Sequence, residues 1–161
     1  MSIEKYNQRA KKINSLLCVG LDPDFDKIPE KFKQMENPQF EFSKWIISET
    51  HEYTASYKTN SAFYEARGDE GLRELKATMD YLRREHPDIF TICDAKRGDI
   101  GNTNNGYIAE ILDWLGFDAM TLHPYMGGAV GGGHGADYAI ADPKLAYVEP
   151  AKQLALMAVD L

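Results

Sequence analysis

Cysteine is scarce in this sequence, and its two cysteines, Cys18 and Cys93, lie far apart. Each falls within an apolar run of the kind that forms a strand. Such placement is typical of reduced thiols in a protein core rather than of a disulfide or a metal site. We therefore expect both thiols to be reduced and buried.

Long apolar runs and an excess of positive charge are also missing. No stretch approaches the roughly 20 apolar residues that a membrane-spanning helix needs, and the first nine residues lack the apolar core of a signal peptide. Asp and Glu outnumber Lys and Arg by 25 to 18, which gives a net charge of −7. This charge disfavours nucleic acid and anionic membranes as partners. From the missing apolar segments and the reduced thiols, we expect a cytoplasmic protein.

Apolar, strand-like runs alternate with amphipathic, helix-like segments along most of the chain. Repeated strand–helix units build right-handed βαβ crossovers and a parallel sheet with helices outside it, so the predicted fold class is α/β. A complete (β/α)8 barrel typically needs about 250 residues, and 161 residues predict about four βα units of a truncated or incomplete barrel. The expected strands are 16–20, 55–59, 89–94 and 118–122, and the first of them is expected to be fully buried. The expected helices are 3–14, 39–53, 69–85 and 104–115.

The alternation stops after residue 126. Residues 127–135 hold six of the 13 glycines in the chain. Backbone N–H groups of such a loop can cradle a phosphate, but no P-loop lysine accompanies them, which favours a flexible linker. Residues 145–161 suit a final helix. The sequence thus predicts a barrel-forming part over 1–126, followed by a linker and terminal helix over 127–161.

Polar side chains follow each of the four predicted strands. Asp22 follows the first strand, and Lys58 and Asn60 belong to the end of the second. The charged stretch 94–99 closes the third strand, and His123 follows the fourth. Because the carboxyl ends of parallel strands meet at one end of a barrel, where active sites lie, the pattern predicts an active site there. A lone histidine in such a place is more often structural than a metal ligand or an acid–base group.

The charged stretch suits one kind of chemistry. Asp94 and Lys96 share a strand face, the turn at Gly98 can bring Asp99 back toward them, and Lys58 completes an alternating array of lysines and aspartates. Lys96 between carboxylates stays protonated and can act as a proton donor. The array would disfavour a substrate carboxylate beside Asp94 and stabilise the charge left after its departure, as decarboxylation requires. A partly solvated salt-bridge network is the structural alternative.

Four motifs, spread over about residues 10–127, resemble those of orotidine 5′-phosphate decarboxylases, particularly the longer bacterial form. The resemblance implies a (β/α)8 TIM barrel that acts as a homodimer without a metal or organic cofactor. It also implies conversion of orotidine 5′-monophosphate to uridine 5′-monophosphate and carbon dioxide, a step of de novo pyrimidine biosynthesis. The motifs occur in the family's order at 17–24, 57–64, 94–103 and 121–127.

The same resemblance implies roles for individual residues. Lys96 corresponds to the proton donor, and Asp94 to the carboxylate placed against the leaving group. Lys58 corresponds to the lysine that orders the array and contacts the ribose, and Asp22 to the carboxylate that binds a ribose hydroxyl.

Further residues are implied to bind substrate. Asp99 and Thr103 would reach into the site of the partner subunit, and Ile100 would line the pyrimidine pocket across the same interface. Asn60 is a candidate substrate contact by its position and equally a turn former.

The chain departs from the family where the phosphate should be held. The family uses a glutamine and an arginine from later barrel loops, but here no arginine follows Arg97 and Gln153 is the only glutamine after Gln39. We therefore expect impaired decarboxylase activity. Two alternatives stay open: a Mg²⁺-dependent sugar-phosphate decarboxylase or aldolase with a similar D-x-K-x-x-D array, and a noncatalytic half-barrel that oligomerises or binds a partner.

Overall fold

The structure, a computed structural model, describes residues 2–99, 101–123, 129–130 and 139–140. The chain divides into two compact units. The first, here called the sheet unit, comprises Met1–Ala95 and Ala109–Thr121, and the second comprises Lys96–Ile108 and Leu122–Leu161.

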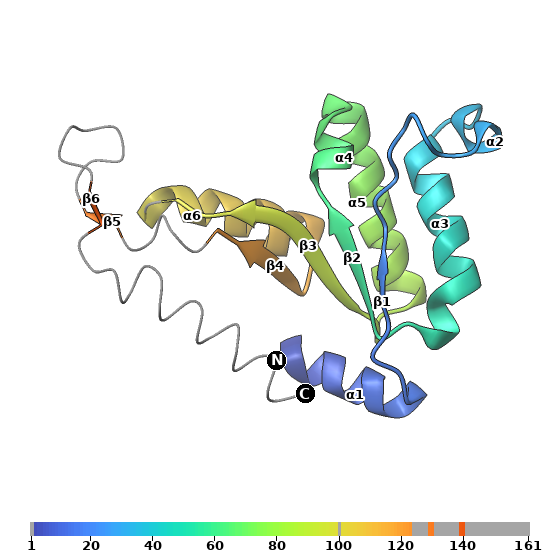
Figure 1. The fold of residues 1–161 in the computed structure, drawn as a ribbon, viewed down its shortest axis with the longest axis horizontal. Helices are drawn as coiled ribbons and strands as arrows, with labels where there is room; N and C mark the ends of the chain where they lie inside the picture. Colours follow the sequence, from blue (N-terminus) through green and yellow to red (C-terminus); the bar gives the residue numbers. More distant parts are fainter. Residues whose placement is uncertain (1, 100, 124–128, 131–138, 141–161) are drawn as a thin grey trace. The chain divides into compact units, whose positions relative to one another are not determined.

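Helices and strands alternate through most of the described residues (Figure 1). The helices are α1 (Ser2–Ile13), α2 (Glu30–Lys33), α3 (Pro38–Thr50), α4 (Ala62–Glu65), α5 (Gly68–Glu85) and α6 (Gly101–Ile108), with a 3-10 turn η1 (His51–Tyr53) and a π-helical segment η2 (Ala109–Leu115). The strands are β1 (Cys18–Gly20), β2 (Ser56–Asn60), β3 (Phe90–Arg97), β4 (Ala119–Leu122), β5 (Ala129–Val130) and β6 (Ala139–Ile140).

Four strands form one parallel sheet in the order β1-β2-β3-β4. The register places Val19 opposite Tyr57, and Tyr57 opposite Thr91. A strand order that follows the chain order needs a crossover between each pair of neighbours, and the helices supply these crossovers. The predicted α/β class and its parallel sheet are confirmed.

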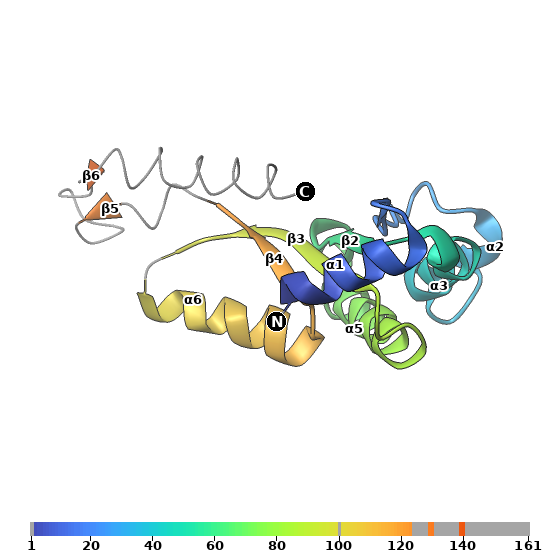
Figure 2. The ribbon, with the colours of Figure 1, turned by 90° about the horizontal axis from the view of Figure 1, so that it is seen from below.

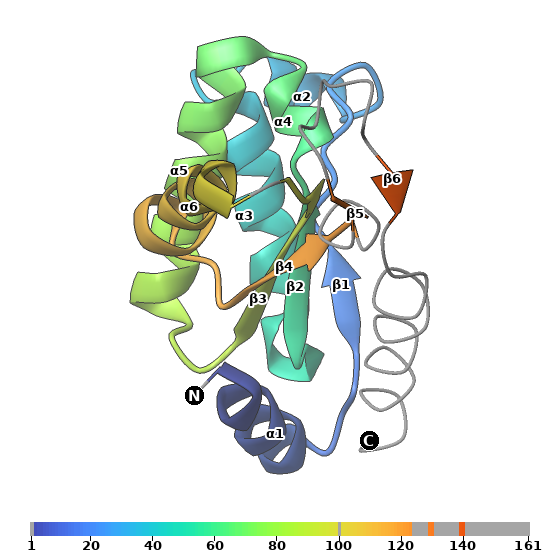
Figure 3. The same ribbon diagram turned by 90° about the vertical axis from the view of Figure 1, so that its left-hand side faces the viewer.

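The core lies between one face of this sheet and the helices α3 and α5, which cover that face (Figure 3). Ile47 of α3, Leu75 of α5 and Tyr57 of β2 are completely buried there. Because side chains alternate along a strand, the burial of Tyr57 and Thr59 leaves Lys58 directed to the opposite face of the sheet.

The helix α1 lies across the amino ends of the strands, as the view from below shows (Figure 2). Its contacts are with the residues that immediately precede the strands. The buried Arg9 donates hydrogen bonds to the carbonyl of Thr54 at 3.1 Å and to Asp88 at 3.0 Å. Lys5 forms an ion pair with Asp118 at 2.7 Å. The helix α1 thus contacts the amino ends of the strands, and the polar residues that follow the strands lie at the opposite ends.

The expectation of a fully buried first strand is wrong. In β1, Cys18 and Gly20 are exposed and Val19 is only partly buried. The reason is the position of β1 at the edge of the sheet, where β2 is its one neighbour among the described residues. The predicted burial of Cys18 is therefore also wrong, whereas that of Cys93, on the inner strand β3, is confirmed.

The expected single helix over 104–115 is also corrected. The helix begins earlier, at Gly101, and changes to a π-helical repeat at Ala109. A π-helical turn contains more residues than an α-helical turn, so side chains on either side of the change lose their common phase. Ile111 and Leu115, within the π-helical segment, are buried, whereas Ile108, just before it, is 40% exposed.

Other expectations differ in length or fall elsewhere. The third strand continues to Arg97, three residues beyond its predicted end. The predicted domain boundary after residue 126 and the predicted helix over 145–161 lie outside the described residues. Within the described part, no helix combines the length and the apolar character that crossing a membrane requires.

Candidate active site

Two carboxylates from the neighbouring strand ends lie beside the charged side chain of Lys58. The ammonium group of Lys58 lies 3.0 Å from Asp94 Oδ2 and 3.8 Å from Asp22 Oδ2. The register explains the meeting, because Lys58 pairs with Gly20 on one side and with Ile92 on the other. The structure thus brings together three of the residues that the sequence singled out.

Both carboxylates are also held through their second oxygen. Thr121 Oγ1 donates a hydrogen bond to Asp94 Oδ1 at 2.9 Å, and the backbone N–H of Asn60 donates one to Asp22 Oδ1 at 2.7 Å. We call Asp22, Lys58, Asp94 and Thr121 the strand-end array. All four residues belong to the sheet unit.

The surroundings of Lys58 keep its side chain charged. Partial burial lowers the pKa of Lys58, but the hydrogen bond with Asp94 and the charges of Asp22 and Asp94 outweigh it, so the pKa lies above its ordinary value. At neutral pH this residue is therefore a fixed positive charge between two carboxylates and not a base. The Asp94 side chain, only 13% exposed, is shielded from solvent beside it.

Asn60 fills a local structural role in this arrangement. Its side-chain oxygen accepts a hydrogen bond from the backbone N–H of Ala62 at 3.1 Å, at the start of α4. Asparagine commonly makes such bonds in turns. The side chain of Asn60 therefore acts as a turn former, and its backbone N–H positions the carboxylate of Asp22.

A buried polar network that the sequence did not reveal anchors the loop after β1. The carboxylate of Glu74 accepts hydrogen bonds from the backbone N–H groups of Gln39 at 2.6 Å and Phe40 at 3.0 Å, in the first turn of α3. A negative charge is favourable there because it faces the positive end of the helix. The side chain of Gln39 donates to the carbonyl of Pro23 at 2.8 Å, and Arg67 pairs with Glu74.

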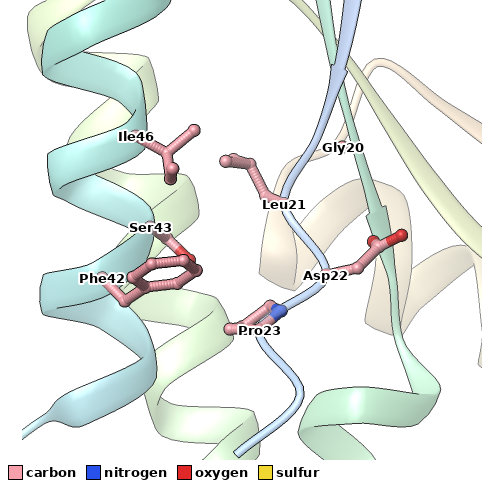
Figure 4. A pocket seen from close by; sticks show the side chains of 7 residues that line it. All are labelled: Gly20, Leu21, Asp22, Pro23, Phe42, Ser43 and Ile46. Carbon is pink, nitrogen blue, oxygen red and sulfur yellow. The ribbon is translucent and has the colours of Figure 1, made fainter. Parts of the chain in front are cut away.

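A cavity of about 190 Å³ lies between this loop and α3, on the side away from the charges. Figure 4 shows the Leu21 side chain directed toward Ile46, whereas the carboxylate of Asp22 points away toward β2. The cavity is consequently separate from the charged groups of the strand-end array. Its lining consists of Gly20, Leu21, Asp22, Pro23, Phe42, Ser43 and Ile46.

Four further candidates, Lys96, Asp99, Ile100 and Thr103, belong to the second unit, and their place beside the array stays a prediction. Lys96 has a φ of 49°, in the left-handed region that residues other than glycine seldom adopt. Asn104 holds the backbone of Asp99 through two hydrogen bonds, at 3.0 and 2.6 Å. Thr103 is exposed on α6, and Ile100 lies outside the described residues.

His123 contacts the turn after β3 through its backbone. Its N–H donates to the carbonyl of Arg97 at 2.7 Å. A Cβ atom on Gly98 would lie 2.7 Å from the carbonyl oxygen of His123, so glycine permits this close approach. Through its backbone, His123 therefore lies against the turn at Gly98 within the second unit.

Among the described residues, no three His, Cys, Asp or Glu side chains gather as they would to hold a metal ion. The two carboxylates of the array each face the ammonium group of Lys58 instead. What the array provides is a carboxylate, Asp94, that is held at both of its oxygens. Such a group can repel a second carboxylate brought against it.

Comparison with known proteins identifies the family. Residues 15–130 match the model of the "Orotidine 5'-phosphate decarboxylase / HUMPS family". The chain belongs to this family. Over 127 residues it is 50% identical to the orotidine 5′-phosphate decarboxylase of Christiangramia forsetii and 48% identical to that of Flavobacterium johnsoniae. Each alignment covers 79% of this chain, and 47% and 46% of the two relatives.

Solved structures of the family agree with the fold. The OMP decarboxylase of Leishmania donovani matches with a TM-score of 0.63 and 38% identity, over 76% of this chain and 44% of that one. The orotidine 5′-monophosphate decarboxylase of Plasmodium berghei matches with a TM-score of 0.63 and 29% identity, over 74% of this chain and 51% of that one. The four parallel strands therefore correspond to part of the family's TIM barrel, as the resemblance implied. The chain spans about half the length of the relatives that it matches.

Proposed function

We propose that this chain carries the residues that decarboxylate orotidine 5′-monophosphate to uridine 5′-monophosphate. The observation that supports the proposal is the strand-end array, in which Lys58 lies between two carboxylates that are each held at a second oxygen. The matched family and its named members support the same substrate and product.

In the proposed reaction, the substrate carboxylate lies against Asp94. Thr121 and Lys58 hold Asp94 in place, so Asp94 cannot move away from the substrate carboxylate. The repulsion between the two carboxylates is relieved only when the substrate loses carbon dioxide. The carbon–carbon bond breaks, its electron pair stays on the pyrimidine ring carbon, and a proton from the ammonium group of Lys96 adds there. This repulsion is present in the bound substrate and is lost as the bond breaks, so it lowers the activation barrier to decarboxylation without strengthening substrate binding.

The remaining candidates are proposed to bind the nucleotide. Lys58 and Asp22 would contact the ribose, with Asp22 accepting a hydrogen bond from a hydroxyl group. Asp99, Ile100 and Thr103 would serve the site of a partner subunit in a homodimer.

Binding of a uridine-monophosphate-like transition-state analogue, measured by calorimetry, tests this proposal. We expect binding that Lys58→Ala and Lys96→Ala each abolish. Lys12→Ala is the matched control, because Lys12 also pairs with a carboxylate, Asp88 at 2.9 Å, but on α1 at the opposite ends of the strands. Absence of binding, or equal binding by all three variants, would refute the proposed site.

Turnover by the purified 161-residue chain is expected to be far slower than that of the longer relatives. The chain has no arginine after Arg97, and Gln153 is its only glutamine after Gln39, so the phosphate contacts implied by the resemblance lack candidates. Binding energy from such remote groups helps to organise the reacting centre. A spectrophotometric assay measures the rate, and turnover comparable to that of a longer relative would contradict this expectation. Turnover that requires Mg²⁺ would favour the sugar-phosphate alternative.

A further inference from the structure

Gln39 is a polar side chain to which the proposed reaction gives no part. It lies in the first turn of α3 and is completely buried. Its side-chain amide donates two hydrogen bonds, to the carbonyl of Pro23 at 2.8 Å and to the carbonyl of Phe63 at 2.9 Å. Pro23 belongs to the loop after β1, and Phe63 belongs to α4, which follows β2. One amide group therefore joins the segments that follow two neighbouring strands.

These two segments adjoin the charged groups of the strand-end array. Asp22 immediately precedes Pro23, and its carboxylate is directed toward β2 (Figure 4). Asn60, whose backbone N–H bonds to Asp22 at 2.7 Å, is the last residue of β2 and lies shortly before Phe63. The amide link consequently sets the spacing across which Asp22 approaches Lys58.

The neighbours of Gln39 fix the orientation of its amide. An amide group carries donors at one end and an acceptor at the other, so only one orientation directs its N–H groups to two carbonyls. Arg67 donates a hydrogen bond to Gln39 Oε1 at 3.1 Å, which holds the oxygen on the other side. Glu74 accepts the backbone N–H of Gln39 at 2.6 Å and also pairs with Arg67. Both polar atoms of the side chain are thus held by partners.

Arg67 holds the loop after β1 at a second place. Its guanidinium group lies over the ring of Phe25, 4.4 Å from the ring centre. Such stacking of a guanidinium group on an aromatic face is attractive. The residues that follow Asp22 are therefore attached twice, at Pro23 through Gln39 and at Phe25 through Arg67.

We propose that Gln39 is a positioning residue for ribose recognition and acts through Asp22. The inference rests on the proposed function, because it takes Asp22 as the group that accepts a hydrogen bond from a ribose hydroxyl. A carboxylate on a loop that is already fixed loses less conformational freedom when the nucleotide binds. Gln39 is too deeply buried to touch the nucleotide, so its contribution to affinity comes entirely from the placement of Asp22.

Amide hydrogen exchange in the free protein tests this placement. The N–H of Asn60 reports the position of Asp22 directly, because Asp22 Oδ1 is its acceptor. Gln39→Met keeps the size of the side chain but cannot donate to a carbonyl, and it should speed this exchange by about tenfold or more, as the loss of one hydrogen bond to a charged group would. Thr54→Val is the matched control. It also removes a buried hydroxyl, which bonds to the carbonyl of Thr50 at 2.8 Å, but at the amino ends of the strands, and it should leave the exchange at Asn60 unchanged.

Calorimetric titration with the uridine-monophosphate-like transition-state analogue tests the part in recognition. We expect Gln39→Met to weaken binding by about tenfold. In an Asp22→Ala background, Gln39→Met should weaken binding no further, because the group on which it acts is already gone. A merely structural role would weaken binding by the same factor in both backgrounds, and that result would overturn the proposal.

Arg67→Lys keeps the inference testable if Gln39→Met does not fold. Lysine retains a positive charge beside Glu74 but lacks the planar group that contacts Gln39, Glu74 and Phe25 together. This variant should speed the exchange at Asn60 and weaken binding in the same pattern, although by less than Gln39→Met.

Failure of this inference can be told apart from failure of the proposed function. A wild type that does not bind the analogue would refute the proposed function, and the exchange at Asn60 would still decide whether Gln39 sets the position of Asp22. Exchange that is unchanged in Gln39→Met and Arg67→Lys, or that Thr54→Val raises equally, would overturn the positioning role.

Discussion

Thr121 has a part in the array that its chemistry alone does not indicate. Its hydroxyl holds one oxygen of Asp94 while Lys58 holds the other, at 2.9 and 3.0 Å. A carboxylate bound at both oxygens cannot rotate away from a group brought against it. We therefore regard Thr121 as a positioning residue for Asp94.

Replacing Thr121 with valine should destabilise the protein, because valine matches the shape of threonine but cannot donate the hydrogen bond to Asp94. Hydrogen bonds to charged groups typically contribute about 1.5–3 kcal/mol, and we expect a loss in that range in the free energy of unfolding. Urea denaturation at fixed protein concentration measures the change. Thr121→Ser keeps the hydroxyl and should lose less; equal losses in the two variants would count against the role of the hydrogen bond.

The sequence indicated some residues of the array and not others for a physical reason. Asp22, Lys58 and Asp94 are charged groups at strand ends, which are costly to bury without partners and therefore conspicuous. Thr121 is a residue type that strands favour in any case, so the motif at 121–127 that begins with it gave no sign of its role. Its contact with Asp94 becomes visible only when the two strands are placed side by side.

At the scale of elements, two histidines bring together the carboxyl ends of α3 and α5. The rings of His51 and His86 have centroids 4.6 Å apart. Burial lowers the pKa of His86, and the charge of His51 lowers it further, so His86 loses its proton more readily in the folded protein than in the unfolded chain.

This pair predicts that stability falls when the solution is acidified from pH 7.5 to 5.5. Below the ordinary histidine pKa of about 6.5, the unfolded chain binds more protons at His86 than the folded protein does, and the free energy of unfolding decreases as pH falls. Urea denaturation across this range measures the slope. His86→Asn should reduce it, and an unchanged slope in that variant would show that other groups cause the loss.

The boundaries of the elements show what local sequence signals leave out. The predicted helix 69–85 agrees closely with α5, but nothing in its pattern explains a glycine at position 71. In the structure a Cβ atom there would lie 1.9 Å from the carbonyl oxygen of Tyr64, so the close approach of α4 and α5 requires glycine. Similarly, the change of repeat at Ala109 depends on packing that periodicity cannot report.

At the scale of the whole molecule, the largest error of the sequence interpretation concerns β1. An apolar run predicts burial because most such runs are central strands, and it does not reveal how many strands a chain supplies. The order β1-β2-β3-β4 leaves β1 at an edge, so the same apolar residues become exposed.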